Sequence, residues 1–209
     1  MELRILIFGD SITWGAGDPE YGGWVTHLRR FFETHGYGNV EVFNLGIPGD
    51  TTDDILVRFR TECRARSRHP NLILFAAGIN DAKYIRSESN PVTPPEKFRK
   101  NVEDLIEKAR EFAADILFLG LSRVDESVTM PLPWSPDEFF SNSKSAEYDS
   151  IIRQTCTRHG LGFIPLSDLP DRSELADGLH PNTEGYRKMF QRILEFLLDH
   201  HYLPKPLNP

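Results

Sequence analysis

Short apolar runs alternate along the chain with longer segments of helical periodicity, and this alternation constrains the fold more than any other feature. The apolar runs are nearly continuous and bounded by turn residues, which is typical of strands covered on both faces of a parallel sheet. Strands are predicted at residues 3–8, 40–44, 72–76, 116–119 and 162–164. Helices are predicted at residues 23–35, 51–66, 95–112, 142–159 and 182–200. The pattern predicts an α/β protein, a three-layer αβα sandwich with a five-stranded parallel sheet.

The length of the chain, 209 residues, fits a single domain with one elaborate loop. We place this domain at residues 1–201 and interpret residues 202–209, which hold three prolines, as an extended C-terminal arm. Residues 120–141 carry three prolines, Trp134 and two phenylalanines between a predicted strand and a predicted helix. This long irregular loop is a candidate wall of a substrate site, and a hydrophobic flap over the end of the sheet is the alternative.

The charge of the chain argues against a nucleic acid as a partner. The sequence has 24 lysines and arginines against 31 aspartates and glutamates, a net charge of −7, whereas a nucleic-acid-binding domain usually carries a basic excess. Five arginines between positions 58 and 68 form a local basic run. One interpretation is an anion-binding patch. The favoured one is a solvated helix face with the ion pairs Asp54–Arg58 and Glu62–Arg66.

No stretch of the sequence is apolar for long enough to cross a membrane. The longest such run, residues 72–79, has eight residues, and a spanning helix needs about 18. The first residues lack the layout of a signal peptide. The two cysteines, Cys63 and Cys156, match no disulfide framework and no zinc spacing. We therefore interpret both as reduced thiols and predict a cytoplasmic location.

Small and polar residues that could carry chemistry follow four of the predicted strands, at 9–11, 46–50, 78–81 and 177–182. The carboxyl ends of parallel strands meet at one edge of a sheet, and α/β proteins bind ligands there. In the first segment, Ser11 is a candidate nucleophile, because His180 could take its proton and Asp177 could orient the imidazole. Each of these residues alone is more often structural. Their joint occurrence favours a hydrolytic site.

Acyl transfer also requires hydrogen-bond donors for the oxyanion. Gly49 could present its backbone N–H, and Asn80 could present its side-chain amide beside the N–H of Ser11. Taken alone, Gly49 is more often a turn glycine and Asn80 a helix cap, and the spacing does not decide between these roles.

The sequence resembles the SGNH/GDSL hydrolases (GDSL-like lipases and acylhydrolases) in four blocks: Gly9-Asp10-Ser11-Ile12, Gly49-Asp50, Gly78-Ile79-Asn80-Asp81 and Asp177-Gly178-Leu179-His180-Pro181. The blocks stand in the family's order, and Ile12 in place of leucine is the departure in the first block. The resemblance implies a flavodoxin-like fold and hydrolysis of esters or thioesters without a metal or another cofactor. It also implies a catalytic triad of Ser11, Asp177 and His180, and an oxyanion hole formed by Ser11, Gly49 and Asn80.

Four other enzyme and binding classes fit the sequence less well. A nucleotide-binding domain is disfavoured because Gly15 and Gly17 are not followed by the third glycine of G-x-G-x-x-G, and no P-loop motif occurs. The sequence has no G-x-S-x-G elbow of a conventional α/β-hydrolase and no H-E-x-x-H metal motif. A binding module that kept the fold and lost catalysis is the more distant alternative.

The expected partner is a small-molecule ester with a short acyl chain, because no long apolar insertion resembles a lid or tunnel. A lysophospholipase or a long-chain acyl thioesterase is the alternative within the same family. Trp14 and Trp134 are candidate substrate-binding residues. Tyr21, Trp24 and Tyr84 either line the same pocket or belong to the core.

Overall fold

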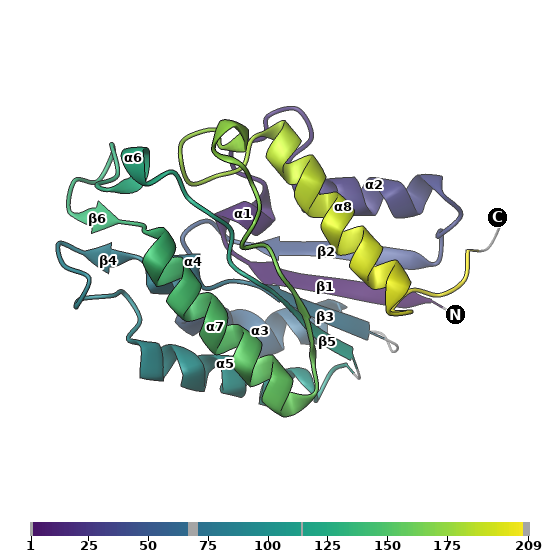
Figure 1. Cartoon of the computed structure of the whole chain (residues 1–209). Coiled ribbons are helices and arrows are strands. Elements are labelled where there is room, and N and C mark those ends of the chain that lie inside the picture. Colours follow the sequence, from purple (N-terminus) through teal and green to yellow (C-terminus); the bar gives the residue numbers. More distant parts are fainter. Residues whose placement is uncertain (1, 67–70, 114, 207–209) are drawn as a thin grey trace.

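A five-stranded parallel sheet forms the centre of the molecule, as the sequence predicts (Figure 1). The computed structural model describes residues 2–66, 71–113 and 115–206. The sheet has the order β2-β1-β3-β5-β7 and consists of β1 (Leu3–Gly9), β2 (Val40–Gly46), β3 (Asn71–Ala76), β5 (Asp115–Leu119) and β7 (Gly162–Ile164). All five predicted strands are confirmed, and four of them are one or two residues longer than predicted.

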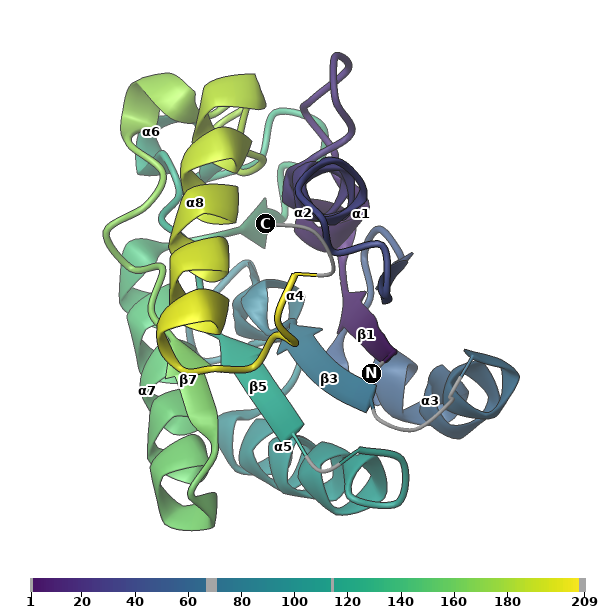
Figure 2. The same ribbon diagram turned by 90° about the vertical axis from the view of Figure 1, so that its right-hand side faces the viewer.

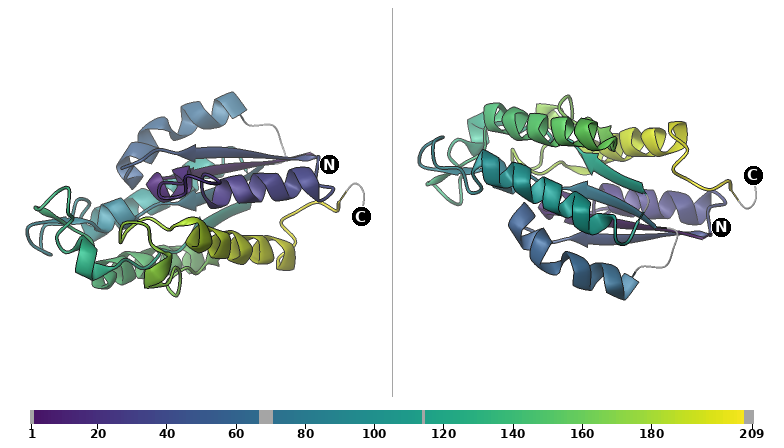
Figure 3. Two further views of the ribbon diagram at one scale, coloured as in Figure 1. Left: turned by 90° about the horizontal axis from the view of Figure 1, so that it is seen from above. Right: turned by 90° about the horizontal axis from the view of Figure 1, so that it is seen from below.

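Helices cover both faces of the sheet, which confirms the three-layer sandwich (Figures 2 and 3). One face is covered by α2 (Trp24–Thr34) and α8 (Thr183–Asp199). The other face is covered by α3 (Thr52–Arg66), α5 (Pro95–Ala109) and α7 (Asn142–His159). Helix α5 ends at Ala109 and not at residue 112 as predicted, because the following residues form a turn in which the Phe112 amide donates to Ala109.

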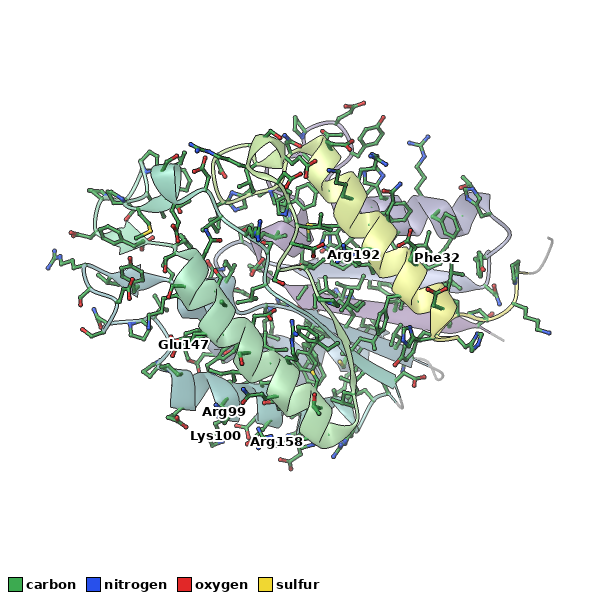
Figure 4. All side chains as sticks on the ribbon, in the orientation of Figure 1. Phe32, Arg99, Lys100, Glu147, Arg158 and Arg192 are labelled. Atoms are coloured by element: carbon green, nitrogen blue, oxygen red, sulfur yellow. The ribbon has the colours of Figure 1, made fainter. Side chains whose placement is uncertain are left out.

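Side-chain alternation along the strands divides the core into two halves. In β1, Ile5 and Ile7 face the layer of α2 and α8, whereas Leu6 and Phe8 face the layer of α3, α5 and α7. All four side chains are fully buried. On the outer surface the helices are joined by ion pairs: Arg158 of α7 contacts Glu103 of α5 at 2.9 Å, and Arg192 of α8 contacts Asp168 at 2.8 Å (Figure 4).

The segment 120–141 is more ordered than its sequence indicates. It contains the short helix α6 (Glu126–Thr129) and the strand β6 (Glu138–Phe139), which pairs in antiparallel fashion with β4 (Tyr84–Ile85). The rings of Tyr84 and Phe139 stack at 5.2 Å. We call the segments 83–92 and 123–141 the extension. It projects beyond the carboxyl ends of the strands (Figure 1). The prediction of an irregular loop at residues 120–141 is therefore wrong in detail. Strand β6 could not be detected in the sequence because a strand of two residues shows no alternation.

The two cysteines and the start of the C-terminal segment both belong to the packed protein. Cys63 and Cys156 are free and buried, and burial raises the pKa of each thiol to about 12. Tyr202 and Leu203 pack against the core, so the C-terminal arm is attached where it begins. Residues 207–209 of that arm lie outside the described residues.

Among the helices of the described residues, none is long and apolar enough to span a bilayer. Within the same residues, no group of three or more histidines, cysteines, aspartates or glutamates is arranged to hold a metal ion.

Candidate active site

The predicted nucleophile lies in a tight turn at the carboxyl end of β1. The one-turn helix α1 (Ser11–Trp14) begins there, and the carboxylate of Asp10 caps it by accepting the Ile12 amide at 2.9 Å. Gly9 makes this turn possible. A Cβ at Gly9 would lie 2.0 Å from Thr13 Oγ1 and 2.4 Å from the Ala76 carbonyl oxygen, so any side chain would push α1 away from β3.

The structure brings Ser11, His180 and Asp177 together. His180 Nε2 lies 2.8 Å from Ser11 Oγ, and His180 Nδ1 lies 2.7 Å from Asp177 Oδ2. The second carboxylate oxygen of Asp177 accepts the backbone amides of Leu179 and His180 at 3.0 and 2.8 Å. Burial opposes ionisation of Asp177, but these hydrogen bonds outweigh it and lower its pKa to about 2. Asp177 is therefore ionised at neutral pH and fixes the imidazole with Nε2 directed to the serine.

Backbone hydrogen bonds close the loop of Asp177 and His180, and the Asp125 amide ties this loop to the extension by donating to the Gly178 carbonyl at 2.7 Å. The Ala176 amide donates to the His180 carbonyl at 2.8 Å, and the Asn182 amide donates to the Glu174 carbonyl at 2.7 Å. Asn182 then caps α8 by accepting the amides of Glu184 and Gly185. The histidine thus precedes a long, buried helix by only a few residues, which limits its freedom to move.

The predicted oxyanion donors come from the turns after β2 and β3. Gly49 has φ +88°, and a Cβ added there would meet no atom within 4 Å, so backbone conformation and not crowding favours glycine. Asn80 lies in the one-turn helix α4 (Ile79–Ala82), is 7% exposed, and donates from Nδ2 to the Asp50 carbonyl at 3.0 Å. Gly78 occupies the N-cap position of α4, so the interpretation of Asn80 as a helix cap is wrong. The bond to Asp50 holds the Asn80 amide next to Gly49, and the second hydrogen of that amide is available to a ligand.

A buried carboxylate with no role predicted from the sequence, Asp81, joins these two turns. Asp81 is fully buried and accepts the backbone amide of Thr52 at 3.0 Å and its hydroxyl at 2.6 Å. Asn101 of α5 donates to the same hydroxyl at 3.0 Å. Burial raises the pKa of Asp81 to about 6, although hydrogen bonds from Thr52 and Thr93 oppose that rise. In the sequence, Asp81 is marked by its place in the block Gly78-Ile79-Asn80-Asp81.

Arg58 supports the same region from α3. It contacts Asp50 at 2.8 Å and donates to the Leu45 carbonyl at 2.8 Å. The predicted pair Asp54–Arg58 is therefore wrong, because the Asp54 carboxylate accepts the amide and hydroxyl of Thr51 instead. The predicted pair Glu62–Arg66 is confirmed. Arg68, the last arginine of the basic run, lies outside the described residues.

Asp10 is the second buried carboxylate at this edge of the sheet. It is 2% exposed, and burial raises its pKa to about 7 in spite of the hydrogen bond from Ile12 and the attraction of His180. In the sequence, Asp10 stands out only by its place in the Gly-Asp-Ser block.

The aromatic candidates fall into two groups. Trp14 is 56% exposed on α1, and Trp134 is 57% exposed in the extension between α6 and β6. That part of the extension lies on the far side of α4 from α1 (Figure 1). Trp24 and Tyr84 are buried in the core, and Trp24 also borders a small crevice beside the Ser11 turn, whereas Tyr21 is partly exposed.

The chain as a whole matches one family of hydrolases. Residues 7–188 match the sequence profile described as the GDSL-like Lipase/Acylhydrolase family. The chain belongs to this family. The four sequence blocks predict this same family.

Curated relatives and solved structures agree with this assignment. Esterase TesA from Pseudomonas aeruginosa is 25% identical over 189 residues, which are 90% of this chain and 85% of that protein. The uncharacterized lipoprotein YqeF of Bacillus subtilis is 34% identical over 112 residues, which are 51% of this chain and 43% of that protein. The match thus spans less than half the length of YqeF.

Among solved structures, a lipase/acylhydrolase from Enterococcus faecalis has a TM-score of 0.74 and 28% identity, with 99% of this chain and 98% of that one covered. The acetylxylan esterase Axe2 from Geobacillus stearothermophilus has a TM-score of 0.70 and 16% identity, with 92% of each chain covered. At that identity the likeness to Axe2 is one of fold.

The raised pKa of Asp81 predicts how stability depends on pH. The unfolded chain releases the Asp81 proton near its ordinary pKa of 3.8, whereas the folded protein retains that proton until the pH approaches its raised pKa of about 6. The contribution of this group to stability is thus full below pH 3.8 and is lost as the pH rises through about 6. The Asp81→Asn variant has no titrating group at this position. We expect the unfolding free energy of the wild type, relative to Asp81→Asn, to fall by up to about 3 kcal/mol between pH 4 and pH 7.

Urea unfolding of both proteins at the two pH values measures this difference. Asp199→Asn, at the exposed end of α8, is the surface control. A difference between wild type and Asp81→Asn that is the same at both pH values would contradict the assignment.

Proposed function

We propose that the protein is a serine esterase that cleaves small carboxylic esters through an acyl-enzyme formed on Ser11. The observation that carries this proposal is the continuous hydrogen-bonded chain from Ser11 Oγ through His180 to Asp177, with distances of 2.8 and 2.7 Å. These distances fall in the range expected for a nucleophile, its general base and the group that orients the base.

The reaction follows from these positions in two halves. His180 takes the proton of Ser11 as the serine oxygen attacks the ester carbonyl, and Asp177 stabilises the imidazolium. The backbone N–H groups of Ser11 and Gly49 and the amide of Asn80 stabilise the oxyanion. His180 then returns the proton to the departing alcohol. In the second half, water takes the place of the alcohol, and the same groups release the carboxylic acid and restore Ser11.

A short acyl chain is the substrate class that we favour. A crevice beside the Ser11 turn, bordered by apolar residues that include Ile12, Ile79 and Leu121, has a volume of about 20 Å³. This is the space of roughly one water molecule, and neither Ser11 nor His180 lines it, so it offers no room for an acyl chain. The preference for a short acyl chain rests on the sequence, which has no long apolar insertion that could form a lid or tunnel. The segment 120–141 supplies a candidate wall on the outer side, and Trp134 is its candidate contact. A lysophospholipase or a long-chain thioesterase would need a groove elsewhere.

Replacement of the serine tests the proposed function itself. Ser11→Ala removes the nucleophile while the oxyanion donors stay, so kcat on p-nitrophenyl acetate should fall roughly 10⁴- to 10⁶-fold. Ser145→Ala changes a serine that is also buried but lies on α7, and it should retain activity. If Ser11→Ala turned over at near the wild-type rate with an unchanged fold by circular dichroism, Ser11 would not be the nucleophile.

The role of Asn80 predicts a change in one kinetic constant. Its amide would contact the oxyanion mainly in the transition state, so Asn80→Ala should lower kcat by roughly 10²- to 10³-fold with little change in KM. Steady-state kinetics with p-nitrophenyl acetate measure both constants. An effect on KM or on thermal stability alone would limit Asn80 to holding the Asp50 turn.

Acyl length gives the third test. We expect kcat/KM for p-nitrophenyl esters to peak between about two and six carbons, because each methylene that enters an apolar pocket adds up to about 0.8 kcal/mol of binding until the pocket is full. Rates are measured below the micellar concentration. A steady rise to ten or twelve carbons would overturn this expectation and favour the lysophospholipase or long-chain thioesterase alternative.

A further inference from the structure

An exposed indole lies one helical turn from the proposed nucleophile. In α1, Ser11, Ile12 and Thr13 are buried, whereas Trp14 is 56% exposed. The turn is firmly held, because Asn44 donates to the Thr13 carbonyl at 2.9 Å and the Trp14 amide donates to the Asp10 carbonyl at 2.9 Å. A large apolar side chain is thus kept at the surface by a rigid support. Core packing does not require its ring.

A surface pocket of about 320 Å³ opens beside this indole. Its lining consists of Trp14, Gly15, Gly17, Asp18, Pro19 and Gly22. Three of these six residues are glycines, and because they lack side chains they leave open space next to the indole ring. Gly15 and Gly23 pack against each other so closely that a Cβ on Gly23 would lie 2.5 Å from Gly15 Cα. The glycines therefore fix the shape of the loop as well as the open space.

The pocket borders the segment that carries His180, although neither Ser11 nor His180 is among the residues that line it. A Cβ on Gly17 would lie 3.1 Å from His180 Cβ and 2.6 Å from the Pro181 carbonyl oxygen, so the loop that lines the pocket contacts the loop that carries the base. In ester cleavage the leaving alcohol takes its proton from the histidine and must lie beside Nε2. The acyl group then extends in another direction from the carbonyl carbon. The pocket is thus placed for the alcohol.

The charge of the pocket favours an uncharged occupant. Asp18 is its one ionisable residue, and it is 4% exposed. Its carboxylate accepts Thr183 Oγ1 at 2.7 Å and the amides of Gly23 and Tyr21 at 3.0 and 3.2 Å. Burial opposes ionisation of Asp18, but these hydrogen bonds lower its pKa overall. The carboxylate is already satisfied by the protein and offers no free partner to a charged alcohol.

We propose that Trp14 and the glycine loop 15–22 form the subsite for the alcohol of the ester, and that this alcohol carries an uncharged ring that stacks on the indole. The inference rests on the proposed function, because it needs the departing alcohol at His180. Sugars and aromatic alcohols both present such a flat face. The pocket recognises the ring, and the identity of the acyl group does not affect this contact.

The test compares Trp14 with an exposed apolar residue outside the pocket on one set of acetyl esters. Trp14→Ala removes the exposed indole, and Val57→Ala removes an exposed apolar side chain of α3 that does not line the pocket. The substrates are methyl acetate, phenyl acetate and an acetylated methyl xyloside. Trp14→Ala should lower kcat/KM on the ring esters roughly tenfold, as expected for about 1.4 kcal/mol of stacking, mainly through KM. Methyl acetate should be hydrolysed at the wild-type rate by both variants.

The outcomes separate the inference from the proposed function. Loss on phenyl acetate alone identifies an aromatic alcohol, loss on the xyloside alone identifies a sugar, and recovery in Trp14→Phe supports stacking in either case. An equal loss on methyl acetate, no loss on any ring ester, or the same loss in Val57→Ala would overturn the subsite. If the wild type hydrolysed none of the three esters, the proposed function itself would fail, and the subsite with it.

Discussion

Carboxylates that accept backbone amide hydrogens hold the functional edge of this sheet together. Asp10 fixes the turn of Ser11, Asp81 fixes the turn of Thr52 beside Gly49, and Asp177 fixes the loop of His180. Asp149 does the same for the Leu121 amide at 2.9 Å. Such bonds are directional and are made with charged acceptors, so they define turn geometry more tightly than apolar packing does. The relative positions of the proposed nucleophile, base and oxyanion donors depend on them.

The same carboxylates weaken the fold where they are deeply buried. Burial raises the pKa of Asp10 to about 7 and that of Asp81 to about 6, so each costs stability when it ionises. Asp177 is the opposite case, because its hydrogen bonds lower its pKa to about 2 and it stays charged at neutral pH. Within one small region the protein thus keeps one carboxylate firmly ionised beside the histidine and two others that titrate near neutral pH.

Much of this arrangement could be predicted from the sequence, because parallel strands bring their carboxyl ends to one edge. That rule placed Ser11, Gly49, Asn80 and His180 together. The link from Asp81 to Thr52 could not be predicted, since it depends on side-chain direction at positions 29 residues apart. The strands β4 and β6 were missed because two residues show no alternation. The pair Asp54–Arg58 failed because spacing along a helix does not show which partner lies nearer in space.

The contact between the extension and the catalytic loop bears on how such a protein diversifies. The Asp125 amide donates to the carbonyl of Gly178, between Asp177 and His180, at 2.7 Å, and a Cβ on Gly178 would lie 2.7 Å from Val128 Cβ. The outer part of the extension closes on itself through β4 and β6. Insertions or deletions around β4 and β6 would therefore leave the loop of His180 in place, whereas changes at Asp125 or Val128 would reach the base. Selection, in nature or in the laboratory, can vary the outer part of the extension more freely than the part that touches this loop.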